Sequence, residues 1–269
     1  MSKDFQVVML ASGSKGNSAL ISTDSQRFLV DIGLSCRELV KRLHEAGASP
    51  KELEGVFITH EHIDHVKGLV TFAKYYDVPI YASEGTFRFL FNKYGKLERR
   101  NCRLTGPSML CGDVRVDAFA IPHDAVQPQG YSFTWKSAGS KCTYITDTGF
   151  VTPLVNEAAK DSDVLVLEAN HDVEMLKNGS YPYDLKQRIL GTRGHLANVT
   201  AGQFLLTMPK LPKQVILAHL SQQNNTPKLA YETVKHILEQ KGRLQETELI
   251  VAAQDHPVAN EAVLMPRLY

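Results

Sequence analysis

The sequence predicts a mixed α/β fold with an open sheet whose strand ends meet along one edge. Short apolar runs rich in β-branched residues, such as 56–59, 164–167 and 215–218, alternate with amphipathic helical segments. Each of these runs is followed directly by a histidine or a glutamate. Because the strand ends of an open sheet line a common crevice, we expect these polar side chains to gather in one site.

Composition is that of an ordinary globular protein. The 269 residues can bury a substantial core in one large or two small domains. A net charge of +1 excludes strong overall attraction to nucleic acid, although a local basic patch remains compatible with it. Four widely spaced cysteines indicate reduced thiols, and the first residues do not resemble a signal peptide, so we expect a cytoplasmic protein. No stretch approaches the roughly 20 apolar residues of a membrane span, so no membrane partner is expected.

The first third of the chain is predicted to form strands that lead into a helix. Strands are expected over 5–10, 19–22 and 27–30, and a helix over 35–46 between a serine N-cap and a glycine C-cap. The third strand ends at Asp31, whose carboxylate we expect to fix a neighbouring loop by accepting its amides. Asp31 is therefore predicted to hold the neighbouring loop in place and not to be a metal ligand itself.

The loop between the first two strands carries Ser14, Lys15 and Asn17 among small and hydroxyl residues. Two glycines let its backbone approach a ligand closely, and its amides suit an anion. An ordinary hairpin turn explains the same residues and is the more frequent arrangement. Both interpretations stay open.

Residues 60–65 hold the densest group of metal-ligating side chains. His60 and His62 are two apart in extended chain and leave it on the same side, so one metal ion can take both. Asp64 and His65 lie where the chain turns into a helix and therefore point elsewhere. The stretch predicts two adjacent metal ions. A solvated polar loop is the alternative, but this density of ligands disfavours it.

Further residues of this kind follow other predicted elements. Any one of them would be interpreted as a buried, hydrogen-bonded polar residue, but their recurrence at strand ends indicates one shared site. They are His123, Asp147, Glu168 and His219. The remaining strands are expected over 80–82, 114–121, 131–135, 141–145, 164–167, 215–218 and 249–252, and the remaining helices over 84–94, 196–206 and 229–240.

The order His60-x-His62-x-Asp64-His65, then His123, Asp147 and His219, resembles the metallo-β-lactamase superfamily over essentially the whole chain. The resemblance implies a four-layer αββα sandwich, with residues 1–269 forming a single domain of two pseudo-symmetric halves. It also implies a ligand set. His60, His62 and His123 would hold one metal ion, Asp64, His65 and His219 the other, and Asp147 would bridge them.

Residues outside the ligand set resemble a nuclease branch of this superfamily. Glu168, His195 and His219-x-Ser221 are similar to ribonuclease Z type enzymes, whose long tRNA-binding arm this sequence lacks. The chain resembles the YycJ/WalJ-type proteins more closely still. The motifs that carry this resemblance are Ser12-Gly13-Ser14-Lys15-Gly16-Asn17-Ser18, Tyr181-Pro182-Tyr183, Gly194-His195-Leu196 and His219-Leu220-Ser221-x-x-Asn224-Asn225. That family implies a cytosolic DNA exonuclease acting from the 5′ end, associated with DNA repair or cell-wall regulation. Ala197-Asn198-Val199 departs from the Ser-Asn-acidic pattern expected there.

The resemblance implies two divalent metal ions, and the ligand chemistry suits zinc, manganese or iron. Our hypothesis is that a metal-bridging hydroxide, held by Asp64 and Asp147, attacks phosphorus. His195, oriented or charged by Glu168, would protonate the leaving alkoxide or hold a phosphate oxygen. Alternatively, His195 is a loop histidine that caps the helix expected after it.

Two segments carry the cations that a nucleic acid partner needs. The segment between His171 and His195 combines lysines and arginines with tyrosines, which fits either phosphate contacts with base stacking or a homodimer interface. The basic stretch 88–103 fits a substrate-facing surface or a solvated face equally well. The predicted substrate contacts are Ser14, Lys15, Asn17, Tyr181, Lys186, Arg188, Arg193 and Ser221.

Several functions share such a site. We expect a phosphodiesterase acting on nucleic acid, DNA in preference to RNA. The alternatives are a hydrolase of small esters, thioesters or cyclic phosphodiesters, a ribonuclease, and a non-catalytic binding protein that keeps its metal for folding.

Overall fold

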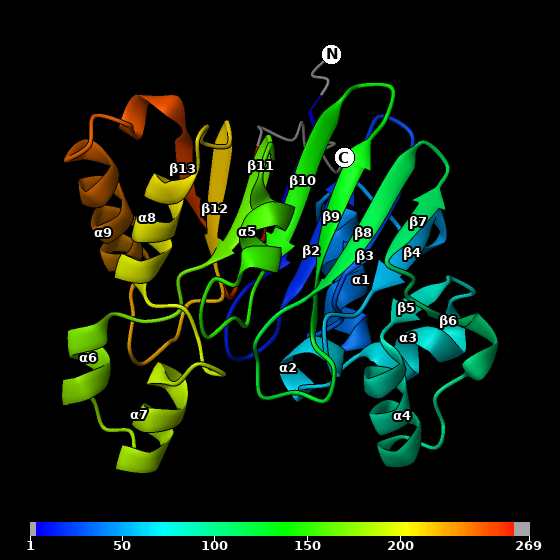
Figure 1. Cartoon of the computed structure of the whole chain (residues 1–269). Helices are drawn as coiled ribbons and strands as arrows, with labels where there is room; N and C mark the ends of the chain where they lie inside the picture. The colour runs from blue at the N-terminus through cyan, green and yellow to red at the C-terminus, as the bar shows by residue number, and fades with distance from the viewer. Residues whose placement is uncertain (1–3, 261–269) are drawn as a thin grey trace.

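The computed structural model describes residues 4–260, which form two seven-stranded sheets packed face to face (Figure 1). From edge to edge, the first sheet holds β14 (Val258–Ala259), β1 (Gln6–Ala11), β2 (Ser18–Ser22), β3 (Arg27–Val30), β4 (Leu53–Phe57), β5 (Ile80–Ala82) and β6 (Cys102–Leu104). The second holds β13 (Glu248–Val251), β12 (Gln214–Ala218), β11 (Val164–Glu168), β10 (Ser140–Ile145), β9 (Gln129–Trp135), β8 (Val114–Ala120) and β7 (Ser108–Cys111).

Both sheets combine an antiparallel part with a parallel part. Strands β1 to β3 and β7 to β10 pair antiparallel, whereas β3 to β6 and β10 to β13 pair parallel. Parallel neighbours need long crossover connections, and such connections place helices on the outer face of each sheet. The relation between the two halves as a pseudo-symmetric pair within one domain stays a prediction.

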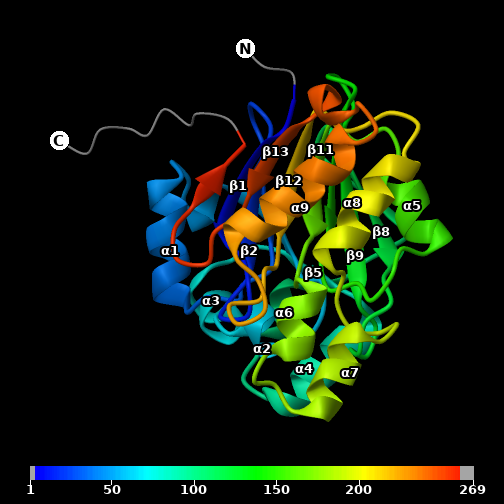
Figure 2. The same cartoon turned by 90° about the vertical axis from the view of Figure 1, so that its left-hand side faces the viewer.

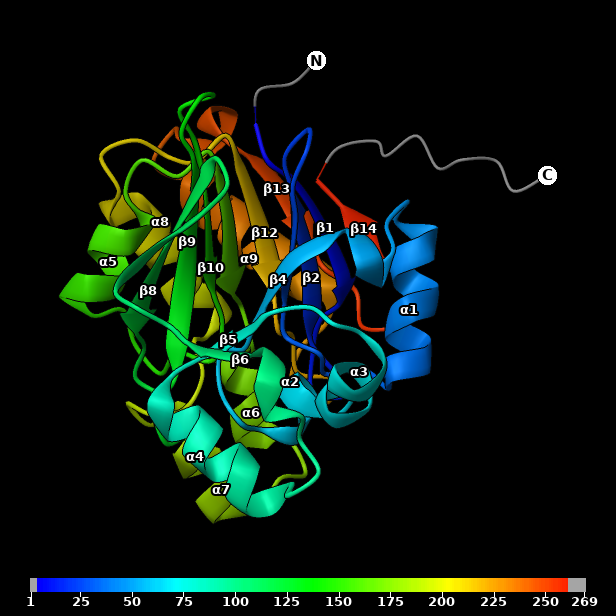
Figure 3. The same ribbon diagram turned by 90° about the vertical axis from the view of Figure 1, so that its right-hand side faces the viewer.

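Helices cover the outer face of each sheet (Figures 2 and 3). On the first sheet these are α1 (Cys36–Glu45), α3 (Leu69–Tyr75) and α4 (Glu84–Lys93), and on the second α5 (Pro153–Ala159), α8 (Asn198–Thr207) and α9 (Pro227–Glu239). One apolar cluster fills each helix–sheet interface and a third fills the space between the sheets. Because strands such as β11 are buried along their whole length, their sequences read as continuous apolar runs. The predicted αββα sandwich is confirmed.

Three short helices lie at one end of the sandwich, below the sheets in Figure 1. They are α2 (Ile63–Val66), which follows β4, and α6 (Val173–Asn178) and α7 (Tyr183–Leu190), which follow β11. The chain segments that leave β4, β11 and β12 meet at this end. None of the helices within residues 4–260 is long and apolar enough to cross a lipid bilayer.

The strand predicted over 56–59 is β4, which ends two residues earlier. The amide of Ile58 still donates to the sheet, at Tyr81 O (2.8 Å), but the amide of Thr59 turns to the Asp31 carboxylate. The Asp31 side chain therefore ends the hydrogen bonding of this strand to the sheet. The pattern of apolar residues in the sequence does not show this contact. The helix predicted after the motif is divided into α2 and α3 at Gly68. The Gly68 amide donates to Ile32 O (3.0 Å), and a Cβ there would lie 2.4 Å from Leu34 O.

Other expectations agree with the structure at the level of single caps. Ser35 accepts from the amide of Glu38 at the start of α1, and Gly47, at φ 71°, follows the C-cap Ala46. Strands β6, β7 and β14 and helices α5, α6 and α7 were not predicted. These elements are short and lie mainly at sheet edges or on the surface, where tertiary pairing rather than local pattern decides the structure.

Candidate metal centre

The chain between β4 and α2 brings His60 and His62 to the end of the first sheet. Their ring centroids lie 4.5 Å apart, and the ring of His123, from the loop after β8, lies 5.0 Å from His60 and 5.1 Å from His62. Each of these three residues offers a ligand atom within 4.8 Å of the others. We call them the first ligand group.

A second ligand group consists of Asp64, His65 and His219, whose ligand atoms also lie within 4.8 Å of one another. Asp64 and His65 project from α2, and His219 follows β12 directly. Asp147, after β10, stands between the groups: its Oδ2 lies 3.2 Å from His65 Nε2, and its Oδ1 lies 3.7 Å from His123 Nε2. The structure therefore places all seven predicted metal ligands together, with Asp147 central.

Three of the residues that follow strands adopt left-handed backbone conformations. Asp31, Asp147 and His219 have φ values of 62°, 57° and 57°. Such values are uncommon for residues with a Cβ, although Asp and His tolerate them better than most. Each residue stands at the end of a strand, where the left-handed turn redirects the chain out of the sheet. Strain of this kind persists where the surrounding contacts enforce it, and it is frequent at functional sites.

Several atoms that face the two groups are buried without a hydrogen-bond partner in residues 4–260. They are His60 Nε2, His219 Nε2, Asp147 Oδ2 and Asp124 Oδ1. Buried polar atoms are normally satisfied, so a set of unsatisfied polar atoms at one point indicates a further partner. Imidazole nitrogens and carboxylate oxygens are the donor atoms that divalent cations take from proteins. The residues present therefore fit divalent metal binding.

Behind His65, the buried carboxylate of Asp31 holds several groups at once. It accepts from Nδ1 of His65 (2.8 Å), from the amide of Thr59 (2.8 Å) and from the Thr59 hydroxyl (2.9 Å). The hydrogen bond from a loop amide to Asp31, which the sequence predicted, is thus present. Because Nδ1 is occupied by Asp31, Nε2 of His65 is the nitrogen that points to Asp147.

In the second sheet, Glu168 is the buried carboxylate that accepts several hydrogen bonds, as Asp31 does in the first. Its Oε1 accepts from Nδ1 of His195 and Nδ1 of His219, both at 2.8 Å, and its Oε2 accepts from the amides of Thr148 and Leu196. The bond to His195 was expected, whereas the bond to His219 was not. His195 does not cap α8, since the N-cap is Ala197 and the His195 ring turns to Glu168 instead. The capping interpretation is wrong.

The charges around the groups favour a cation. Burial by itself would lower the pKa of His219, but Asp147, together with Asp64 and Glu168, raises it to about 10. Burial by itself would raise the pKa of Glu168, but His195 and His219 hold it at about 2. Burial and then His65 keep the pKa of His60 well below its ordinary value, so this imidazole stays neutral, as a metal ligand must.

A cavity of about 270 Å³ opens over the two groups. Four of the eight predicted substrate contacts line it, namely Ser14, Tyr181, Arg188 and Ser221. The others lie outside its lining. Lys15 donates its amide to Gln254, Lys186 bonds Lys177 O within the α6–α7 segment, and Arg193 is exposed.

Asn17 is fully buried, and its amide nitrogen lies 3.3 Å from Asp64 Oδ2 and 3.1 Å from His65 Nε2. These contacts give Asn17 a part in holding the second ligand group, and a direct substrate contact for it stays a prediction. The loop that carries it joins the antiparallel pair β1 and β2, so the hairpin interpretation is confirmed. Ser14 lines the cavity, and a contact between this loop and a ligand stays a prediction.

Sequence reasoning did not identify Asp124, which lies between the cavity and α7. Its Oδ1 is 3.3 Å from His123 Nε2, and its Oδ2 pairs with Nε of Arg188. The only local signal is a carboxylate beside a strand-end histidine. Asn170, Leu185 and Ile189 also line the cavity, and the sequence carried no signal that they would.

Comparison with known proteins agrees with this geometry. A family model described as "Beta-lactamase superfamily domain" matches residues 26–220. Exodeoxyribonuclease YycJ of Bacillus anthracis is 38% identical over 237 residues, which cover 87% of this chain and 89% of that protein. Exodeoxyribonuclease WalJ of Streptococcus pneumoniae is 38% identical over 241 residues, which cover 88% of this chain and 89% of that protein.

Among solved structures, the metallo-β-lactamase fold protein YhfI from Bacillus subtilis has a TM-score of 0.69 at 15% identity, covering 94% of this chain and 99% of that one. This likeness shows the fold. The family model and the two relatives cover most of the chain at an identity that shows common descent. The chain belongs to the β-lactamase superfamily of metal-dependent hydrolases and, within it, to the family of the YycJ and WalJ exodeoxyribonucleases.

Proposed function

We propose that this chain is a nuclease that hydrolyses phosphodiester bonds of DNA, as an exonuclease acting from the 5′ end. The similarity to two exodeoxyribonucleases over most of the chain supports this function. The observation that carries it in the structure is the position of Asp147 between two adjoining ligand groups, beside a histidine that is not part of either. Two ligand groups sharing one carboxylate suit a dinuclear centre.

The first ligand group would hold one divalent ion and the second another, with Asp147 touching both. When bound, two such ions lower the pKa of a water molecule and offset negative charge at the attacking and leaving oxygens of a phosphodiester. An anionic substrate needs that neutralisation more than an amide or ester does. Zinc, manganese and iron all suit these ligands.

Proton delivery falls to His195 in this proposal. Glu168 fixes its Nδ1, so Nε2 is the nitrogen available to the leaving oxygen, and His195 lines the cavity. His195 would give its proton to the departing alkoxide, and Glu168 would act as the positioning residue.

Helix α7 forms one wall of the cavity, with Tyr181 just before it and Arg188 on it. We propose that Arg188 contacts a substrate phosphate in exchange for Asp124 and that Tyr181 stacks on a base. The alternative role of this segment, a homodimer interface, remains compatible with the exposure of Tyr183. The double variant Lys186→Glu/Arg188→Glu separates them: lost DNA binding at unchanged molecular mass supports the substrate role, and a changed mass supports the interface.

The proposed function is tested with linear duplex DNA labelled at the 5′ or the 3′ end and supplied with manganese or zinc. We expect release of labelled mononucleotides from the 5′-labelled strand first, and no release after chelation of the metal. Matched RNA, a cyclic nucleotide, an acyl-glutathione and a lactone serve as competing substrates. Faster turnover of any of these than of DNA would contradict the proposal, and intact DNA with a metal-replete preparation would favour a non-catalytic role.

A further inference from the structure

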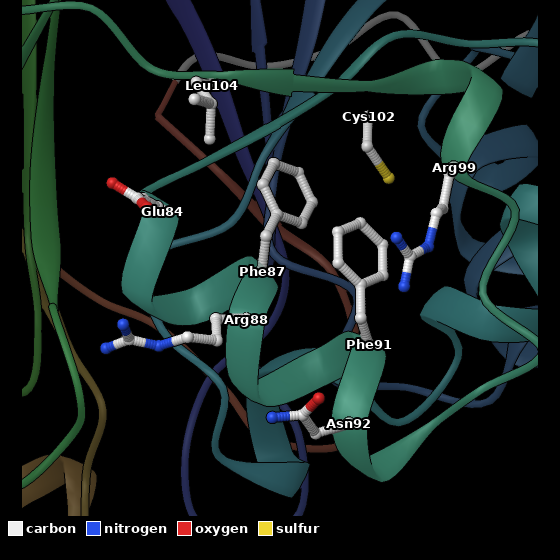
Figure 4. Close-up of a pocket in the computed structure, with 8 residues that line it drawn as sticks. All are labelled: Glu84, Phe87, Arg88, Phe91, Asn92, Arg99, Cys102 and Leu104. Carbon is white, nitrogen blue, oxygen red and sulfur yellow. The ribbon is translucent and has the colours of Figure 1, made fainter.

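A second cavity, of about 490 Å³, lies away from the metal centre, between α4 and the edge strand β6 (Figure 4). Phe87 and Phe91 rise from α4 into it, and Cys102 and Leu104 face them from the strand. The two phenylalanine rings are stacked, with centroids 5.5 Å apart and planes inclined by 7°. The guanidinium of Arg99 lies 4.2 Å from the centre of the Phe91 ring. The cavity is thus walled by flat apolar surfaces with a cation beside them.

This cavity is joined to the metal centre by hydrogen bonds at the start of α4. Glu61, between the two histidines of the motif, accepts from the amide of Val126 (2.7 Å) and from the Thr86 hydroxyl (3.4 Å). The amide of Gly85 donates to Gln127 Oε1 (2.8 Å). The loop that carries His123 is therefore held against the first turn of α4, so one loop connects the wall of this cavity to the metal centre.

The stretch 88–103, which supplies Arg88 and Arg99 to the cavity, is strongly basic. Residues 88–103 contain six lysines and arginines but one glutamate, although the whole chain has a net charge of +1. Arg100 pairs with Asp77 at 4.0 Å. Arg88 and Arg99 make no ion pair within residues 4–260. Exposed cations in excess of their partners attract a polyanion.

The polar groups at the rim suit the edge of a nucleobase. Glu84 can accept from an exocyclic amine and Asn92 can both donate and accept, and both line the cavity. The Cys102 thiol bonds Glu98 O, and burial raises its pKa to about 11, so it stays neutral. A neutral thiol is a poor metal ligand, which leaves flat stacking surfaces as the main feature of the cavity.

We propose that this cavity binds one unpaired base of the DNA strand whose phosphodiester occupies the metal centre, or of its complement. Aromatic faces accept any base, so the cavity would select single-stranded segments without reading their sequence. The proposal rests on the nuclease function proposed above. It assigns the basic stretch 88–103 to the substrate-facing role that the sequence left open.

The test compares two probes with the full-length protein: a fluorescent oligothymidylate with uncleavable phosphorothioate linkages, and an abasic oligomer of the same length and linkage. The wild type is expected to bind the base-bearing probe about tenfold more tightly. Phe91→Ala should reduce this ratio severalfold, to the part that stacking on Tyr181 supplies, and Arg99→Glu should weaken binding of both probes. Phe89→Ala is the matched control, because Phe89 lies on the same helix but outside the cavity lining and should keep the ratio.

Phe91→Leu serves as a second variant, since leucine keeps apolar contact without the stacking face. Melting temperatures and metal contents near the wild-type values show that the variants are folded. An unchanged ratio in folded Phe91→Leu would overturn the proposal, as would a wild type that does not prefer bases, in which case an apolar peptide becomes the better occupant. Cleavage of unmodified DNA by the wild type is measured separately, so that failure of the nuclease function is told apart from failure of this cavity.

Discussion

The two ligand groups differ in the residues that contact the Nδ1 atoms of their histidines. In the first group, His60 lies against the Thr59 hydroxyl, and His123 against the carbonyl of Gly194, both neutral partners. In the second, His65 and His219 each direct Nδ1 at a buried carboxylate 2.8 Å away, Asp31 and Glu168. A carboxylate behind an imidazole raises the basicity of the ligand and fixes its orientation.

Among the histidines of the two groups, His62 alone is substantially exposed, because His60 and His123 are as buried as His65 and His219. The side chain of His62 is 32% exposed, whereas that of His65 is fully buried. We therefore infer that the second ligand group binds its metal ion more tightly, and that the first exchanges its ion more readily. On this inference, two groups with the same number of ligands differ in metal affinity, because the residues hydrogen-bonded to the ligands fix their orientation and basicity.

The largest expected effect comes from removing the residue that the two groups share. Asp147→Ala should lower turnover about 1,000-fold or more, since metal-assisted charge stabilisation is worth several kcal/mol and this side chain touches both groups. Metal content per chain, measured by mass spectrometry of the elements, should fall as well. The control is Asp161→Ala, an exposed aspartate with a similar backbone conformation. Full activity of the Asp147 variant would refute the shared role.

His195→Ala tests the proposal that His195, which lies beside Asp147, donates a proton and is not a metal ligand. It should reduce turnover about 100-fold while leaving metal content intact, because only the proton donor is lost. Rates are compared with those of His44→Ala, an exposed histidine on α1. Loss of bound metal would show instead that His195 is a ligand, and an unchanged rate would remove it from the mechanism.

Asp31→Asn addresses the comparison between the groups directly. Asparagine tolerates the left-handed backbone and can still accept from the Thr59 amide, so the substitution removes the negative charge and the acceptor oxygen that face Nδ1 of His65. The affinity of the tighter metal ion should fall about 10- to 100-fold, and that of the weaker ion should not change. Chelator titration resolves the two steps, with Asp161→Asn as the matched control. A fall in the weaker step alone would reverse our ranking of the groups.

The smallest effect is expected for Thr59→Val. The Thr59 hydroxyl lies 2.9 Å from Asp31 Oδ2 and 3.0 Å from His60 Nδ1. It therefore connects a ligand of the first group to the carboxylate that supports His65 in the second. Its loss should reduce the free energy of unfolding by about 1 kcal/mol and weaken both metal ions slightly. Urea denaturation measures the first, and half-buried Thr200→Val on α8 is the control. A strong effect on one ion only would show that the hydroxyl serves a single group.

The sequence was informative wherever chemistry follows from local order. Histidines two residues apart in extended chain leave on one side, and a carboxylate directly after a buried strand meets the amides of the next loop; the rings of His60 and His62 and the bonds of Asp31 show both. It was uninformative for α6 and α7. In α7 every residue is at least partly exposed, so its apolar pattern carries little signal.

The sequence by itself determined the kinds of ligand, their grouping at strand ends and the superfamily, because side-chain chemistry and short spacings are properties of the chain alone. Only the tertiary structure decided that Glu168 serves two histidines, that Asn17 supports α2 and that Asp124 pairs with Arg188. These contacts join residues far apart in the chain, and they depend on strand order and register, which arise only when the two sheets pack together.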